Sequence, residues 1–89
     1  MVRVVFTNAL ERFVPCPPQQ VQGKTVREAL DAAFAVNPRV RGYILDEAGA
    51  VRHHVVIFAD GQAITDRATL ADQIQPNSEI YVMQALSGG

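Results

Sequence analysis

The chain has 89 residues, 48% of them hydrophobic, and a formal net charge of −1 at pH 7. This length allows one small domain, and the hydrophobic content predicts a folded core. The mixed, near-neutral charge excludes the basic field of a nucleic-acid-binding domain, and no stretch approaches the ~20 apolar residues of a membrane span, so we expect a cytoplasmic protein.

The N-terminal segment predicts two strands. Residues 2–7 alternate between apolar and other side chains, which is typical of a half-buried strand, and residues 12–14 predict a short second strand. The prolines within 15–18 should then stop regular pairing, because proline has no backbone N–H to donate. Cys16 lies among these prolines, where we expect a sheet edge, and no histidine is close in sequence to activate it as a nucleophile.

Residues 25–36 predict the main helix. Thr25 can cap its first turn, and Glu28 three residues later completes a capping box. Four apolar residues then recur at helical spacing and form one face: Val26, Leu30, Ala33 and Phe34. Pro38 ends the helix, because the residue before a proline is pushed out of the α region.

Three later segments are expected to lack strands. Residues 39–50 are interpreted as a connector that ends in a turn at 46–49. Its apolar side chains should pack against the core: Val40, Tyr43, Ile44 and Leu45. A single helical turn is predicted at 69–72 and a reverse turn at 76–77.

Three further strands are expected. Residues 52–59 show the strongest strand pattern, and Asp60-Gly61 predicts a hairpin into a short strand at 62–64. The last strand is predicted over 79–84, where apolar residues occupy both faces.

One helix can cover only one face of this sheet. The other face should therefore keep exposed apolar surface, which on a small protein often marks a partner site. In the last strand we assign the β-branched Ile80 and Val82 to the core. We place Tyr81 and Met83 on the helix-free face together with Ile57, and these three are the predicted partner-binding residues.

The chain ends in Leu86-Ser87-Gly88-Gly89. Two terminal glycines add nothing to a fold, since glycine loses more backbone freedom on ordering than any other residue. Without a Cβ they can instead pass through a narrow enzyme channel and bring the carboxylate of Gly89 to a reactive centre. We expect 86–89 to be a flexible tail on a domain formed by 1–85, with a reach of at most ~13 Å at ~3.3 Å per extended residue.

The order of the expected elements is that of a ubiquitin-like roll, and the chain resembles the small sulfur-carrier proteins of the ThiS/MoaD family over nearly its whole length. The similar stretches are 25–30 at the helix start, 41–49 in the connector, 54–61 at the middle strand and its turn, and 79–89 with the terminal Gly-Gly. The resemblance implies an α+β protein: a ubiquitin-like β-grasp roll with a mixed four- to five-stranded sheet and one main helix packed on one face.

The resemblance also implies a chemistry for Gly89. An E1-like adenylating enzyme would activate its carboxylate with ATP and Mg²⁺, and a sulfur donor such as a rhodanese or cysteine desulfurase would displace AMP to leave a thiocarboxylate. A sulfur-accepting synthase would then use the sulfur in cofactor, cysteine or tRNA-thiolation biosynthesis. Gly88 would supply clearance, Leu86 and Ser87 the tether. The chain would be a carrier rather than an enzyme, with no cofactor site of its own.

Other functions are compatible with the same fold and the same terminal Gly-Gly. Gly89 could be joined to lysines of other proteins, as in a ubiquitin-like modifier, and Lys24 is the only lysine in this chain. The chain could instead be the small subunit of a molybdopterin synthase, or an interaction domain with an incidental tail. The Leu86-Ser87 approach to Gly-Gly differs from that of many relatives, which leaves the pathway open.

No residue pattern predicts a metal site. His53 and His54 are adjacent, and neighbours on a strand point to opposite faces, so they cannot readily chelate one ion together. Asp60, Asp66 and Asp72 are interpreted as turn-type acids and not as a catalytic pair.

Overall fold

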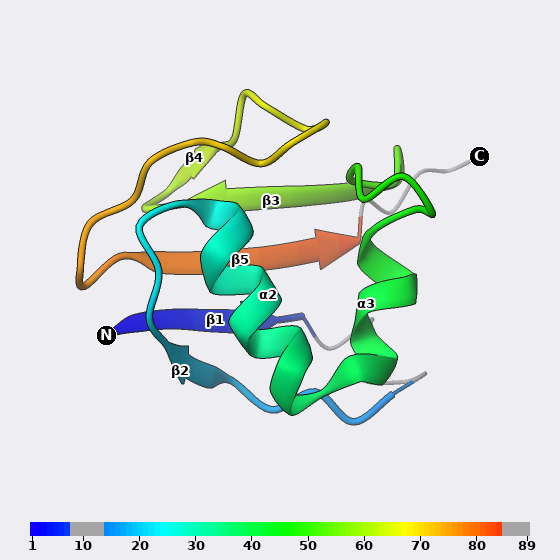
Figure 1. The fold of residues 1–89 in the computed structure, drawn as a ribbon, viewed down its shortest axis with the longest axis horizontal. Coiled ribbons are helices and arrows are strands. Elements are labelled where there is room, and N and C mark those ends of the chain that lie inside the picture. The colour runs from blue at the N-terminus through cyan, green and yellow to red at the C-terminus, as the bar shows by residue number, and fades with distance from the viewer. Residues whose placement is uncertain (8–13, 85–89) are drawn as a thin grey trace.

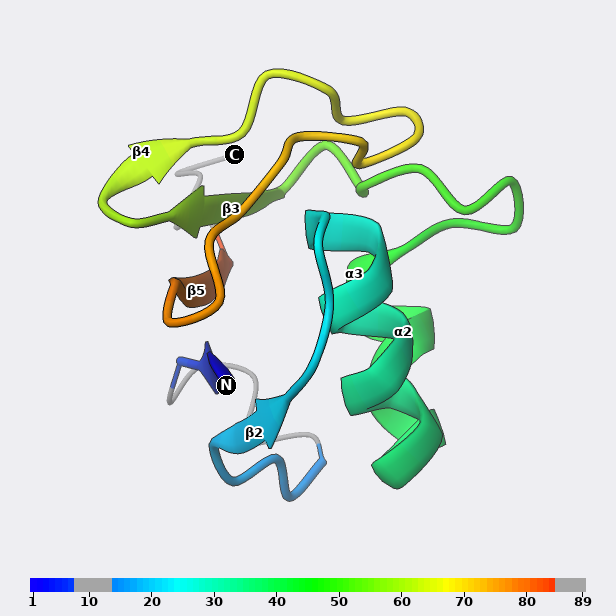
Figure 2. The same cartoon turned by 60° about the vertical axis from the view of Figure 1, so that its left-hand side comes forward.

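The computed structural model describes residues 1–7 and 14–84, which form a sheet with helices on one side (Figure 1). With the labels of Figure 1, its elements are β1 (Val2–Phe6), β2 (Gln19–Val21), α2 (Val26–Val36), α3 (Pro38–Ile44), β3 (Val55–Ala59), β4 (Gln62–Ala63) and β5 (Glu79–Gln84). Turned by 60°, the view in Figure 2 shows both helices on the same side of the sheet. None of these helices is long and apolar enough to cross a membrane.

The five strands form one mixed sheet in the order β2-β1-β5-β3-β4. β5 pairs in parallel with β1 and antiparallel with β3, while β2 and β4 form the two antiparallel edges. The last strand of the chain is therefore the centre of the sheet. The strand predicted over 79–84 is confirmed with the same bounds.

The expected main helix is confirmed as α2. The Thr25 hydroxyl accepts a hydrogen bond from the Glu28 N–H (3.2 Å), and the Glu28 carboxylate accepts one from the Lys24 N–H (2.9 Å). The first bond satisfies an N–H that the first turn leaves open. The second resembles that of a capping box, but the carboxylate accepts from the residue before the N-cap instead of from the N-cap itself. The Asn37 N–H closes the other end on the Ala33 carbonyl (3.0 Å).

The connector prediction for 39–50 is wrong in its first half, where the chain forms α3. Pro38 both ends α2 and occupies the first turn of α3, a position that suits its fixed φ and missing N–H. Val40 and Ile44, one helical turn apart, are buried, and Leu45 follows them into the core. Tyr43 is 38% exposed, so it does not pack into the core as expected. The sheet thus carries two helices instead of one.

The second strand also lies elsewhere. Of the predicted strand at 12–14, only Val14 falls within the described residues, and it is a buried residue outside any strand. β2 instead follows the prolines, and its Val21 pairs with Val2. A three-residue edge strand of Gln-Gln-Val has too little apolar alternation to be recognised in sequence.

The hairpin at Asp60-Gly61 is confirmed, with both residues at positive φ (51° and 84°), as the tightest hairpin turns require. The helical turn expected at 69–72 is wrong. One turn closes earlier, where the Leu70 N–H donates to the Asp66 carbonyl (3.0 Å), and Leu70 then takes φ 57°. That conformation turns the chain and still buries the Leu70 side chain completely.

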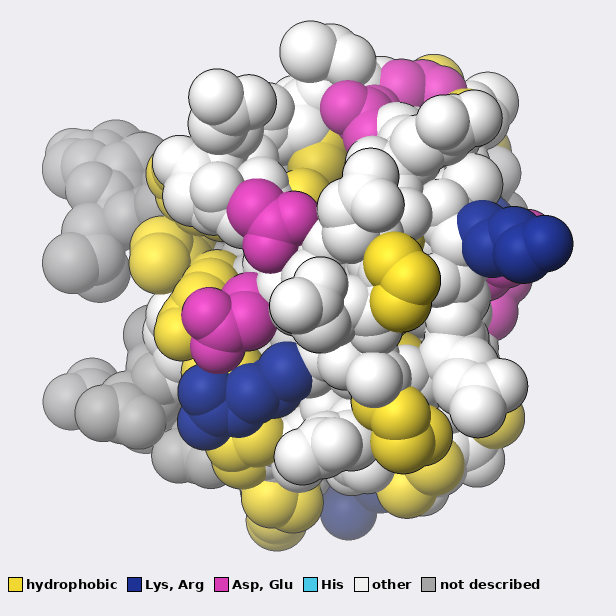
Figure 3. All heavy atoms as spheres, turned by 90° about the vertical axis from the view of Figure 1, so that its left-hand side faces the viewer, with side chains coloured by type: hydrophobic (Ala, Val, Ile, Leu, Met, Phe, Trp, Pro, Cys, Tyr) yellow, Lys and Arg dark blue, Asp and Glu magenta, His cyan; other side chains and the backbone are white. Residues whose placement is uncertain are grey.

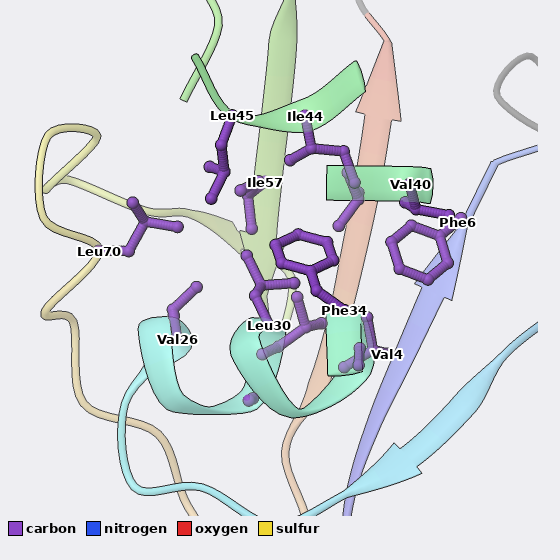
Figure 4. Close-up of a cluster of buried hydrophobic side chains, with 14 of the residues drawn as sticks. Val4, Phe6, Val26, Leu30, Phe34, Val40, Ile44, Leu45, Ile57 and Leu70 are labelled. Atoms are coloured by element: carbon purple, nitrogen blue, oxygen red, sulfur yellow. The ribbon is translucent and has the colours of Figure 1, made fainter. Parts of the chain in front are cut away.

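The core lies between the helices and the sheet (Figure 4). Leu30 and Phe34 from α2, with Val40 and Ile44 from α3, face side chains of the strands. The strand contribution comes from alternate residues: Val2, Val4 and Phe6 of β1, Val55 and Ile57 of β3, and Ile80 and Val82 of β5. Within residues 1–7 and 14–84, the helices cover only this face of the sheet, and the other face carries no helix (Figure 2).

Candidate functional site

The predicted tail residues Leu86, Ser87, Gly88 and Gly89 lie outside the described residues. The structure does define the point from which they leave. β5 ends at Gln84, which pairs with Val55 at the start of β3. Because β5 is the central strand, with β1 on one side and β3 on the other, the segment that follows Gln84 begins at the middle of the sheet.

The helix-free side of the sheet carries an apolar surface beside that point. We call it the open face and define it by Val5, Val56, Phe58, Tyr81 and Met83. Strand register places these residues in neighbouring rows: Tyr81 lies between Val5 and Phe58, and Met83 lies beside Val56. Met83 is 37% exposed, and the other four side chains are partly exposed.

Ile57, predicted to share this face, is instead fully buried in the core (Figure 4). It pairs with Val82, and directly opposed residues on paired strands point to the same side of the sheet. Since Val82 is a core residue, Ile57 must be one too. Sequence reasoning therefore missed Val56 and Phe58, which alternate with Ile57. Applying the same alternation of buried and exposed positions to β3 as to β5 could have found them.

Tyr81 and Met83 point away from Ile80 and Val82, as the alternation in β5 predicts. Their part in binding a partner stays a prediction. Met83 is nearer the end of β5, in the row next to the pair Gln84–Val55.

Charged residues border the far end of the open face. Arg3 lies opposite Glu79, and their side chains form an ion pair at 3.2 Å. Figure 3, which faces the left-hand side of Figure 1, shows hydrophobic side chains along the helix-free side of the sheet with charged ones beside them. The open face thus has a charged pair at the end away from Met83.

The segment opposite the end of β5 is held by one arginine. The Arg67 guanidinium donates from a single nitrogen to the Arg52 carbonyl (2.7 Å) and to the Val55 carbonyl (2.6 Å). These two carbonyls flank the turn that contains His53 and His54 and that starts β3. Arg67 therefore fixes the backbone against which the last residue of β5 pairs, and no sequence pattern indicated this role.

The two histidines lie in that turn and not on a strand as expected. Their rings are 5.5 Å apart and nearly perpendicular, in an edge contact. In the part of the chain that the structure describes, no group of three or more His, Cys, Asp or Glu side chains is placed to hold a metal ion. Cys16 is 1% exposed, and a buried thiol in apolar surroundings is a poor nucleophile.

The three aspartates close turns, in agreement with their interpretation from sequence. Asp66 accepts a hydrogen bond from the Thr69 hydroxyl and further bonds from backbone N–H groups, which lower its pKa to about 2. The Ser78 hydroxyl and the Glu79 N–H lower the pKa of Asp60. Backbone N–H donors at 65 and 66 lower the pKa of Asp72. All three carboxylates are committed to loop structure.

No protein-family model matches the chain, and no curated protein matches it in sequence. Solved structures match it over nearly its full length. The crystal structure of SAMP1 from Haloferax volcanii has a TM-score of 0.78 at 21% identity, covering 99% of this chain and 98% of that chain. A chain of the Amycolatopsis orientalis BexX/CysO complex has a TM-score of 0.84 at 14% identity, with both chains fully covered at 100%.

Mycobacterium tuberculosis CysO gives a TM-score of 0.81 at 16% identity, covering 97% of this chain and 100% of that one. Identities this low establish the architecture alone. The structural likeness agrees with the mixed sheet whose last strand is central and with the two helices on one side of it, as described above. The chain therefore has the ubiquitin-like β-grasp fold, with an α+β composition.

Proposed function

We propose that this chain is a sulfur carrier whose Gly89 carboxylate is adenylated by an E1-like enzyme and converted to a thiocarboxylate. The observation that carries the proposal is the position of β5. A terminal Gly-Gly follows the central strand of a ubiquitin-like sheet, beside an apolar face that no helix of the described part of the chain covers. The likeness to CysO, a protein solved in complex with BexX, supports action with a partner protein.

The order of the reaction steps follows from the low electrophilicity of the Gly89 carboxylate. A carboxylate spreads its negative charge over two oxygens and resists attack, so ATP must first supply a better leaving group. The outer sulfur of a donor persulfide then attacks the acyl carbon of the adenylate and AMP departs with the electron pair. A thiol cleaves the resulting S–S bond, forms a disulfide with the donor, and leaves the thiocarboxylate on Gly89. ATP and Mg²⁺ would be held by the activating partner, and this chain would contribute the acyl end and the open face.

Conjugation to proteins is the second candidate. Small archaeal modifier protein 1 has been solved from Haloferax volcanii and from Methanosarcina acetivorans, and both structures resemble this chain with TM-scores of 0.78 and 0.80. The same activated Gly89 could then be attacked by a lysine amine rather than by sulfur. A role as the small subunit of a molybdopterin synthase would require a large catalytic partner to enclose the tail.

Intact mass separates these candidates. The chain is incubated with a candidate activating enzyme, ATP, Mg²⁺ and a sulfur donor. A carrier gains the mass difference between one sulfur and one oxygen atom, and that gain disappears when Gly89 is deleted. A modifier instead forms higher-mass conjugates that resist reductant. An unchanged mass with partners that do adenylate the chain would contradict the carrier proposal.

A further inference from the structure

The charges at the border of the open face are self-complementary. Arg3 of β1 lies opposite Glu79 of β5, and two residues along the same parallel pair Val5 lies opposite Tyr81. These four side chains point to the helix-free side, so each strand presents one charged residue followed by one apolar residue. The order is the same on both strands and the charges are opposite. Two copies of this face can therefore pair without bringing like charges together.

The two charged side chains remain accessible although they pair with each other. The side chain of Arg3 is 48% exposed and that of Glu79 is 49% exposed. Their ion pair joins the Arg3 Nη1 to the Glu79 Oε2 at 3.2 Å. A guanidinium has further N–H donors and a carboxylate has a second acceptor oxygen, so each group can hold another partner from the side of the open face.

We propose that the open face binds the open face of a second copy, so that the chain forms a reversible twofold dimer. The twofold axis lies parallel to the strands and passes between β1 and β5. Rotation about it exchanges the two strands, so Arg3 of each copy lies over Glu79 of the other, and Val5 lies over Tyr81. Such a contact is isologous and closes at two copies.

The geometry of sheet packing suits this dimer. Two facing sheets lie about 10 Å apart, a gap that an arginine and a glutamate side chain bridge together. In the part of the chain that the structure describes, α2 and α3 lie on the opposite side of the sheet and leave the approach open (Figure 2). The formal net charge of −1 adds little repulsion between the copies.

The area of the face sets the strength of the dimer. Three strands spaced about 4.8 Å apart and about 20 Å long offer about 300 Å² per copy, or ~600 Å² in total. Specific, stable complexes bury about 1,200–2,000 Å² in total, so this dimer forms at high concentration and dissociates on dilution. Tyr81 is covered while the copies are paired, and only the monomer presents the whole open face to another protein. The dimer does not depend on activation of Gly89.

The test exchanges the charges and then mixes the variants. Sedimentation equilibrium of the full chain is measured at low salt from about 10 μM to about 1 mM, a range that spans a dissociation constant of ~0.1 mM. The samples are the wild type, Arg3→Glu, Glu79→Arg, and an equimolar mixture of these two variants. In each variant alone, the facing charges are alike. In a dimer of one variant with the other, every charged contact between copies again joins an acid to a base, whereas positions 3 and 79 within each copy still carry like charges.

Two matched controls change the net charge by the same amounts elsewhere. Arg39→Glu on α3 and Asp31→Arg on α2 replace exposed residues of the helices. They are measured singly and as an equimolar mixture under the same conditions.

We expect the wild type to dimerise and each open-face variant to have a dissociation constant at least about tenfold higher, because two contacts per dimer become repulsive. Mixing the two open-face variants should restore dimerisation, and mixing the controls should produce no gain over either control alone. A wild type that stays monomeric at about 1 mM would overturn the proposal. So would an open-face mixture that dimerises no better than its single variants, or a control mixture that gains as much as the open-face mixture.

Discussion

Single residues on β3 and β5 decide which side of the sheet can receive a partner. Met83 lies on the open face at 37% exposure, whereas Ile57, one row and one face away, is fully buried. A polar substitution therefore alters the surface at one position and the core at the other.

We expect Met83→Asp to weaken binding of the activating partner by about tenfold, the loss of an interface anchor worth ~1–2 kcal/mol. The free energy of unfolding should change by less than about 1 kcal/mol, because the side chain is already exposed. Val36→Asp, at a position 65% exposed on α2, is the matched control and should leave binding intact. Calorimetric titration measures the affinity. A large loss of stability in Met83→Asp would show that this residue supports the core.

The aspartates make stability depend on pH. Asp66, Asp60 and Asp72 all have a pKa lowered by hydrogen bonds in the folded chain, to about 2 for Asp66. The unfolded chain, with an Asp pKa of ~3.9, then binds more protons at acid pH, so the folded state loses stability as the pH falls. This contribution is complete above about pH 5 and disappears progressively toward pH 2.

Urea midpoints measured from pH 7 down to pH 3 should therefore fall. Asp66→Asn should be less stable at neutral pH and show a smaller fall, because the amide cannot titrate. A wild-type midpoint that stays constant over this range would contradict the assignment of these carboxylates as ionised turn closures.

Among the elements, β3 depends on a contact outside the sheet. Arg67 holds the carbonyls of Arg52 and Val55, and the Val51 N–H donates to the Arg67 carbonyl (2.8 Å). These bonds join the 64–70 loop to the first residue of β3, which pairs with the last residue of β5. Arg67, in the loop after β4, thus supports β5, the strand that precedes the proposed reactive end.

Arg67→Gln should cost about 1–3 kcal/mol of unfolding free energy, because it removes charge-assisted hydrogen bonds to two carbonyls. Hydrogen exchange at the Val55 N–H, which donates to the Arg52 carbonyl (2.9 Å), should accelerate more than exchange in α2. Arg39→Gln, on an exposed surface of α3, is the control and should change neither measurement. Uniform acceleration across the molecule would mean that Arg67 stabilises the fold in general and not this segment.

Elements with long, regular patterns could be predicted from sequence, and short ones could not. α2 has caps and a four-residue apolar face, and β5 alternates over six residues, so both were placed correctly. α3 has only seven residues after a proline, and its two buried positions look the same as those of a packed loop. β2 has three residues, and its place at the sheet edge is decided by pairing with β1. The open face was predicted in part, because Tyr81 and Met83 follow from one strand, but Ile57 required the register between two.

At the scale of the whole molecule, one core on one side of the sheet has two consequences. The helices bury the apolar strand residues of one face, and this core is enough for folding. The apolar residues of the other face therefore remain partly exposed. Gly88 and Gly89 carry no side chain that could add to a core.

Deleting Gly88 and Gly89 should therefore shift the melting temperature by less than about 4 °C, the effect of ~1 kcal/mol in a domain of this size. The same deletion should abolish thiocarboxylate formation. Deleting 79–89 instead removes the centre of the sheet and should prevent folding, which circular dichroism would report. Loss of cooperative melting in the shorter deletion would show that the terminal glycines are structural.

The parallel pairing of β1 with β5 also matters during synthesis. Arg3 meets Glu79 only after residue 79 has left the ribosome, and such distant pairings form late because the entropy of closing the loop must be lost first. Until β5 has been made, Val2, Val4 and Phe6 of β1 lack the neighbouring strand beside which they are buried in the folded protein. A nascent chain stopped before β5 is thus exposed to proteases and chaperones. Under the proposed function, an activating enzyme would meet the Gly-Gly end only after the sheet can be completed.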